Sequence, residues 1–179
     1  MASPSRVVVL LRGVNVGRAK RIAMPDFATL LGNLGVTDVR TLLNSGNAVG
    51  TTSIAPGRLA AAVSDAIEER LGFTCDVVVR TRTEIEDVLA NDPFVGVASD
   101  PSRYLVVFLG APPSASAVGS LRGLDVAPEE WSLRGRELYA WLPAGVAESL
   151  VFKHLAKGVL GVTWTGRNIT TVGRVLTAM

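Results

Sequence analysis

The sequence predicts an α+β protein made of two ferredoxin-like (βαββαβ) subdomains, which are joined by a helix and followed by a C-terminal helix. Short apolar runs typical of buried strands alternate with segments whose apolar residues recur at helical spacing. The order strand, helix, strand, strand, helix, strand occurs twice, which indicates a repeated unit. The expected boundaries are 1–82 for the first subdomain, 83–102 for the linking helix and loop, and 103–179 for the second subdomain with its C-terminal helix.

The first subdomain starts with a buried strand at residues 6–11, RVVVLL. A helix follows, with Pro25 in its first turn and Gly35 after its end, positions that these residue types favour. Its apolar residues, spaced i, i+3, i+4 and i+7, are Phe27, Leu30, Leu31 and Leu34. Residues 39–52 predict two strands joined by a tight turn at 44–47. A helix over 56–72 and a strand over 75–81 complete the unit.

The linking helix is predicted to begin at a capping box formed by Thr83 and Glu86, and residues 91–93 end it. The second subdomain then has a strand over 103–110, a weaker helix over 114–124, a hairpin over 129–143 and a helix over 144–158. A short strand over 161–165 closes it. The inward residues expected on the two later helices are Val146, Leu150 and Leu155, and then Ile169, Val172, Leu176 and Met179.

Composition limits the classes of protein that the chain fits. Apolar residues make up 48% of the 179, which is enough for a packed core, and the formal net charge is only +2. No uncharged apolar run approaches the length of about 18 residues that a membrane span needs, and the start lacks a signal-peptide pattern. The single cysteine, Cys75, excludes an internal disulfide and is expected to be a buried, inert thiol. We therefore expect a cytoplasmic protein without contact to membranes.

The segment LLRGVNVGRAKRIAMP, residues 10–25, carries the first candidate site. Its glycines and cations follow a strand and precede a helix N-terminus, an arrangement that suits an anion. The residues proposed to bind a ligand here are Arg12, Asn15, Gly17, Arg18, Lys20 and Arg21. The segment matches neither the P-loop nor the dinucleotide-binding pattern. A long solvated loop is the alternative interpretation.

Two further polar segments are candidates. NSGNAV places Asn44 and Asn47 around a glycine, where they serve either ligand binding or the hairpin turn alone. TGRNITT offers Arg167 and Asn168 next to the last helix, where they either contact an anion or cap the helix. Ser45 lacks the surroundings of a catalytic nucleophile.

The remaining residues with chemical potential have structural explanations. Trp131, Tyr139 and Trp141 could form a stacking platform for bases, but packing is the more typical use. His154 has no recognisable catalytic partner in the sequence. Because no histidine, cysteine or acidic cluster has the spacing of metal ligands, we expect no metal, and nothing predicts another cofactor.

Three stretches together, LLRGVNVG…MPDF, DVRTLLNSGNAV and TGRNITTVGRVL, resemble the DUF1697 family of uncharacterised bacterial proteins. The resemblance runs over nearly the whole chain and implies two ferredoxin-like subdomains in one compact α+β unit, with no established activity. The residues that fit the family pattern are Arg12, Gly13, Asn15, Gly17, Ser45, Gly46, Asn47, Arg167, Asn168 and Thr171. Ile169 stands where the family usually has tryptophan, so packing is its more plausible role.

The three stretches share arginine, asparagine, glycine and hydroxyl groups, which hold anions or amides rather than break bonds. The first hypothesis is therefore binding of an anionic, phosphate-bearing ligand, either a nucleotide or nucleic acid. One alternative is a small enzyme that acts on a phosphorylated or acylated substrate by electrostatic positioning. The other is a structural, self-associating domain. Whether the protein is an enzyme and how many copies associate stay open.

Overall fold

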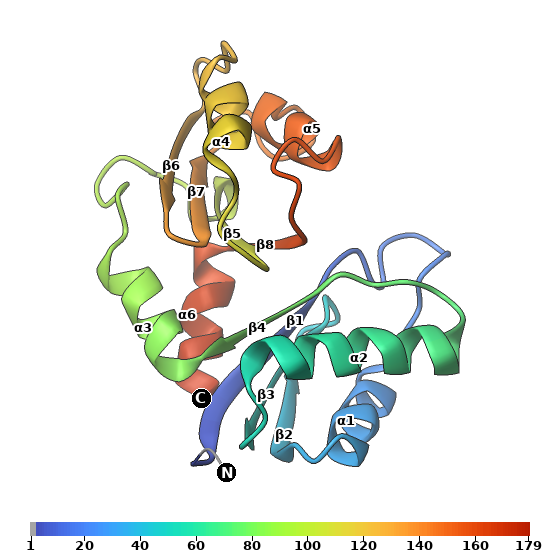
Figure 1. Ribbon diagram of the computed structural model, residues 1–179. Coiled ribbons are helices and arrows are strands. Elements are labelled where there is room, and N and C mark those ends of the chain that lie inside the picture. The colour runs from blue at the N-terminus through green and yellow to red at the C-terminus, as the bar shows by residue number, and fades with distance from the viewer. Residues whose placement is uncertain (1–2) are drawn as a thin grey trace.

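The computed structural model describes residues 3–179 and contains two four-stranded antiparallel sheets within that range (Figure 1). The first half comprises β1 (Ser5–Leu11), α1 (Met24–Asn33), β2 (Thr37–Leu42), β3 (Asn47–Thr52), α2 (Pro56–Leu71), β4 (Val77–Thr81) and α3 (Arg82–Ala90). A 3-10 turn, η1 (Pro101–Arg103), precedes the second half. That half comprises β5 (Tyr104–Leu109), α4 (Ala115–Arg122), β6 (Glu130–Arg134), β7 (Glu137–Trp141), α5 (Leu150–Ala156), β8 (Trp164–Asn168) and α6 (Ile169–Ala178).

The two sheets have matching topologies. The strand order is β2-β3-β1-β4 in the first and β6-β7-β5-β8 in the second, so each first strand lies in the interior of its sheet. The registers match as well. The equivalent cross-strand pairs are Leu10 with Asn47 and Phe108 with Glu137, and likewise Val8 with Arg80 and Val106 with Arg167. The helices α3 and α6, which directly follow β4 and β8, are therefore also equivalent.

Three apolar clusters hold the layers together. The β1 residues Val7, Val9 and Leu11 face α1 and α2, whereas Val8 and Leu10 face a central cluster. That central cluster lies between the two halves and includes α3, α6 and one face of the second sheet. Figure 1 shows α3 and α6 side by side at this junction. The opposite face of the second sheet packs against α4 and α5. Because both faces of the inner strands are buried, they read as continuous apolar runs rather than alternating ones.

Two buried arginines join the halves reciprocally. Arg80 on β4 donates from Nη2 to the carbonyl oxygen of Leu109, the last residue of β5, at 2.6 Å. Arg167 on β8 donates from Nη2 to the carbonyl oxygen of Leu11, the last residue of β1, at 2.7 Å. Each half thus places one guanidinium group against the end of the other half's first strand.

The helix α3 begins two residues earlier than predicted. Thr81 is its N-cap and Glu84 completes the capping box, whereas the sequence analysis assigned these roles to Thr83 and Glu86. Both pairs have the same spacing. With this start, Ile85 lies in the first turn of α3 and packs with Val88 in the central cluster.

The helix α5 is shorter than predicted. It starts at Leu150, and the inward residues are Val151 and Leu155. The prediction that Val146 and Leu150 face inward is wrong, since they are 40% and 41% exposed. Ser149 caps the helix, because its hydroxyl oxygen accepts a hydrogen bond from the backbone of Phe152. The residues before this cap form turns.

The last strand lies further along the chain than predicted. β8 runs over Trp164–Asn168 instead of 161–165. Arg167 is therefore a residue of the edge strand β8, paired with Val106 of β5, and does not stand free in a loop before the helix. Within residues 3–179, no helix is long and apolar enough to cross a membrane.

Both tyrosines of the chain are buried at the central cluster. Tyr139 donates its hydroxyl to the carbonyl oxygen of Val88 at 2.9 Å, and Tyr104 donates to Asp92. Burial raises the pKa of Tyr139 to about 12 and that of Tyr104 further. Since an exposed tyrosine has a pKa near 10, the folded state holds these protons more tightly than the unfolded state.

We expect this difference to appear in alkaline titration. The stabilisation is complete below the unfolded-state pKa of about 10 and is lost as pH rises through the higher folded-state values. Tyrosinate absorbance at 295 nm should therefore rise together with loss of the far-ultraviolet circular dichroism signal. A full tyrosinate signal near pH 10 in a protein that keeps its circular dichroism would contradict this expectation.

Candidate functional site

The three polar segments meet at Arg167. Its guanidinium group is buried and donates hydrogen bonds to six acceptors, one of which is the carbonyl oxygen of the preceding residue, Gly166. These contacts link β8 to the end of β1 and to the β2–β3 turn. The acceptors are Asn47 Oδ1, Thr165 Oγ1 and the carbonyl oxygens of Leu11, Ser45, Gly46 and Gly166.

Every acceptor around Arg167 is electrically neutral. Burial lowers the pKa of Arg167 to about 10, because removal from water disfavours the charged form. The group still carries its charge at neutral pH, and the carbonyl dipoles compensate it. Its fork geometry suits this role, since several N–H groups point at acceptors in different segments. Arg167 therefore braces the three segments from inside.

Asn47 and Asn168, the other predicted binding residues of the second and third segments, form hydrogen bonds within the protein. Asn47 is buried, and its Nδ2 donates to the carbonyl oxygen of Leu42 and to Ser45 Oγ, both at 2.9 Å. Asn168 caps α6 by accepting from the backbone of Thr171 at 2.8 Å. Ile169 packs against the central cluster, in agreement with a packing role.

Asn15 closes the loop between β1 and α1. Its Oδ1 accepts from the backbone of Ile22, and its Nδ2 donates to the carbonyl oxygens of Ile22 and Asn44. Its φ of 58° is a left-handed conformation that asparagine tolerates well. Gly17 has a φ of 66° at an open position of the same loop. Asn15 therefore joins the first segment directly to the second.

Arg12 and Lys20 already have partners in the protein. Arg12 Nη1 lies 2.8 Å from Asp76 Oδ2, and its guanidinium carbon lies 3.7 Å above the ring centre of Trp164. About a third of the Arg12 side chain stays exposed (33%). Lys20 Nζ donates to the carbonyl oxygen of Thr74 at 2.7 Å. Their charges add to the local potential, but these contacts restrict both side chains.

Arg18 and Arg21 differ from these cations. In the part of the chain that the structure describes, neither forms an ion pair or a side-chain hydrogen bond, and both are exposed. Arg21 borders a cavity of about 380 Å³, whose other lining residues are Asn15, Asn44 and the segment 22–24 at the start of α1. The N-cap of α1 is Ala23, whose side chain cannot accept a hydrogen bond from the first turn.

The remaining candidates have packing roles. Trp131 packs on the cluster under α4 and α5, while Tyr139 and Trp141 pack on the central cluster. Cys75 is buried, and burial raises the pKa of its thiol. Among residues 3–179, no group of three or more potential ligand side chains could hold a metal ion.

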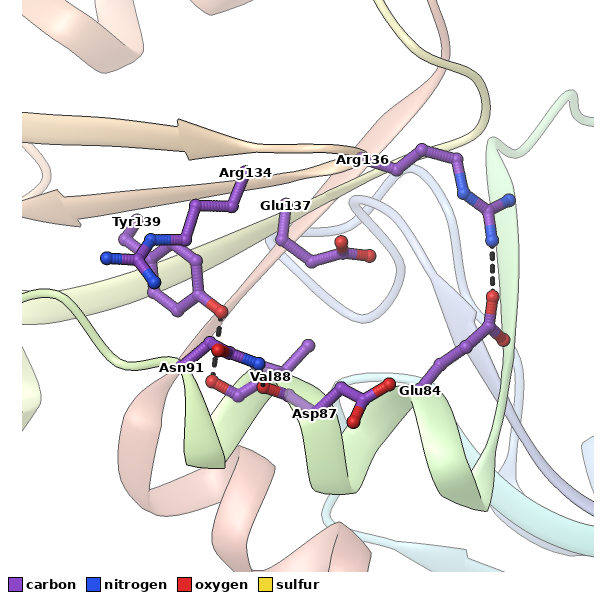
Figure 2. A pocket seen from close by; sticks show the side chains of 8 residues that line it. All are labelled: Glu84, Asp87, Val88, Asn91, Arg134, Arg136, Glu137 and Tyr139. Atoms are coloured by element: carbon purple, nitrogen blue, oxygen red, sulfur yellow. Dashed lines mark hydrogen bonds and ion pairs between the residues drawn. The ribbon is translucent and has the colours of Figure 1, made fainter.

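A second cleft, which the sequence analysis did not find, lies between α3 and the β6–β7 hairpin. It has a volume of about 290 Å³ and carries charged side chains on both walls (Figure 2). Its charged residues come from two segments about fifty positions apart and belong to no recognisable motif. The repeated unit is the one sequence signal for this cleft. In each unit a helix follows the last strand, and in the fold that helix lies near the hairpin of the other sheet: α3 near β6–β7 and α6 near β2–β3.

These features define an α+β protein with two equivalent four-stranded sheets and three polar segments that converge on a buried arginine. The chain belongs to DUF1697, a family described as protein of unknown function, whose model matches residues 5–139. The third segment lies beyond the matched range.

The solved structures include a similar fold. A conserved bacterial protein from Streptococcus pneumoniae superimposes with a TM-score of 0.77 at 20% sequence identity. The match covers 98% of this chain and 99% of that protein, and it supports the fold alone. No curated protein matches the chain in sequence.

Proposed function

We propose that the protein binds an anionic, phosphate-bearing ligand, a nucleotide or a nucleic-acid segment, at the cavity beside the N-terminus of α1. One observation carries the proposal. Arg18 and Arg21 have no partner among residues 3–179, and they lie in the loop that borders this cavity and leads into an uncapped helix N-terminus. Free guanidinium groups and unpaired backbone N–H groups together favour phosphate.

The predicted binding residues divide into three groups under this proposal. Arg18 and Arg21 contact the ligand, while Arg12, Lys20 and the Gly17 turn contribute charge and shape. The amide and buried groups hold the loops in place through their internal hydrogen bonds. These positioning residues are Asn15, Asn47, Arg167 and Asn168.

We further propose that the binding loop belongs to a ferredoxin-like subdomain and that a second such subdomain follows. The support is the element order βαββαβ in each half together with the matching strand orders. The divisions at 1–82, 83–102 and 103–179 follow this pattern.

Replacing both Arg18 and Arg21 by alanine is expected to weaken binding of ATP and of a fluorescein-labelled single-stranded oligonucleotide by about tenfold or more, which corresponds to ~1.4 kcal/mol. Loss of two charge-assisted contacts to phosphate is the reason. Isothermal titration and fluorescence anisotropy measure the two affinities. Both affinities of the unaltered protein should fall as salt concentration rises.

Arg122→Ala is the matched control, because Arg122 is an exposed arginine on α4 in the other half. Equal affinity of the double variant and the control would contradict the assignment of Arg18 and Arg21 as the residues that contact the ligand. If no phosphate-bearing probe binds, the saturated hydrogen bonds around Arg167 favour the structural alternative. Dimer formation measured by sedimentation would then support self-association.

A further inference from the structure

The cleft between α3 and the β6–β7 hairpin has charges of both signs on facing walls. Glu84 and Asp87 come from α3, and Asn91 is its C-cap. Arg134 and Glu137 come from the hairpin, with Arg136 at the turn (Figure 2). The buried residues Val88 and Tyr139 form its floor. This combination of an apolar floor and a few polar walls is typical of small-molecule sites.

Most of these charges are neutralised inside the protein. Glu84 pairs with Arg136 at one end of the cleft, as Figure 2 shows, and also accepts from the backbone of Thr81. Glu137 Oε1 lies 2.8 Å from Arg80 Nε, and Arg80 is almost completely buried behind it. The Glu84–Arg136 and Glu137–Arg80 ion pairs therefore hold these side chains in place, and each pair has a net charge of zero.

Asp87 and Arg134 remain uncompensated. They stand on opposite walls, and both are exposed to the solvent that fills the cleft. Within the described range 3–179, neither side chain forms an ion pair or a hydrogen bond. The cleft therefore offers one free carboxylate and one free guanidinium group that do not pair with each other.

The equivalent positions in the other copy of the unit carry different side chains. Arg134 faces Glu137 across its hairpin as Leu42 faces Asn47 in the first half. In the first half, the neutral side chain of Asn47 accepts from Arg167 Nε, whereas in the second half the carboxylate of Glu137 accepts from Arg80 Nε. The equivalent contact therefore forms without a carboxylate. The position on α6 that matches Asp87, six residues after the N-cap, is Arg174. The charge pattern is thus particular to one cleft.

We propose that this cleft binds a small zwitterion that carries one ammonium and one carboxylate group, of the free amino acid class. The ammonium group lies at Asp87, and the carboxylate accepts two parallel hydrogen bonds from Arg134. The body of the ligand rests on Val88 and the ring of Tyr139. The volume of about 290 Å³ suits a ligand of this size.

Three probes of similar size separate the two charges: L-alanine carries both, ethylammonium only the positive one, and propionate only the negative one. Titration followed by amide NMR shifts should give at least tenfold tighter binding for alanine than for either other probe, with shifts centred on α3 and the β6–β7 hairpin. Asp87→Asn should weaken alanine and ethylammonium by about tenfold, which equals ~1.4 kcal/mol. Arg134→Gln should weaken alanine and propionate instead.

The controls are Glu69→Gln on α2 and Arg122→Gln on α4, which remove an exposed carboxylate and an exposed guanidinium group elsewhere. Both should bind alanine as the unaltered protein does. Equal affinity for alanine and ethylammonium, with no effect of Arg134→Gln, would overturn the zwitterion assignment in favour of a cation site. Absence of shifts around the cleft with all three probes would overturn the site itself. Neither outcome depends on Arg18 or Arg21.

Discussion

Arg167→Met is expected to lower the free energy of unfolding by about 3–4 kcal/mol, because several buried acceptors lose their donor at once. Asn47 Oδ1 and the carbonyl oxygen of Ser45 receive their hydrogen bonds from this guanidinium group. Methionine fills part of the volume but donates nothing. The melting temperature should fall by roughly 10 °C for a chain of this size. Urea denaturation and calorimetry measure the two quantities.

Two further variants separate the hydrogen bonds from the charge. Arg167→Lys keeps the charge but replaces the five donors of the guanidinium fork by the three of an ammonium group, so it should recover only part of the loss. Arg18→Met removes an exposed arginine without internal contacts and should change stability by less than about 0.5 kcal/mol. Arg167→Met with native stability would show that the convergence of the three segments contributes nothing to folding.

Gly46→Ala is expected to cost about 3 kcal/mol through two effects that add. The φ of Gly46 is +76°, a left-handed conformation that a residue with a Cβ adopts at a cost. An added Cβ would also lie 2.7 Å from Leu11 Cβ and 2.8 Å from Val14 Cγ2. Both neighbours are buried, so relief would require movement of the end of β1. Urea denaturation midpoints give the change in stability.

Gly32→Ala is the matched control with the opposite expected sign. Gly32 lies in α1, its added Cβ meets nothing within 4 Å, and its φ is not positive. Alanine should stabilise the helix by about 0.5–1 kcal/mol. If Gly46→Ala were as stable as the unaltered protein, the turn between β2 and β3 would have to adopt another conformation.

Hydrophobic pattern was sufficient to predict the element order, but not every boundary. The runs in β1 and β5 indicate buried strands because both faces of each are covered. The start of α3 could not be chosen locally, since Thr81 with Glu84 and Thr83 with Glu86 form the same pattern. The extent of α5 was overestimated because apolar residues such as Val146 also occur on the surface.

The sequence predicted which polar residue types form the candidate site, but not which of these residues contact one another. Asn47 and Arg167 are separated by 120 positions, and nothing local in the sequence indicates that they touch. The residue type alone does not show whether an arginine is buried and hydrogen-bonded or exposed in a loop. Arg167 and Arg18 are told apart only by the segments that surround them in the fold.

The reciprocal contacts of Arg80 and Arg167 have the form of an isologous interface, in which the same patch meets itself across a two-fold axis. Here the two patches belong to one chain. In a homodimer, any substitution alters both copies of the patch at the same time. A single chain permits each copy to vary alone, so Glu137 can carry a carboxylate where its counterpart Asn47 carries an amide. The fused arrangement thereby lets equivalent positions of one architecture carry different chemical groups.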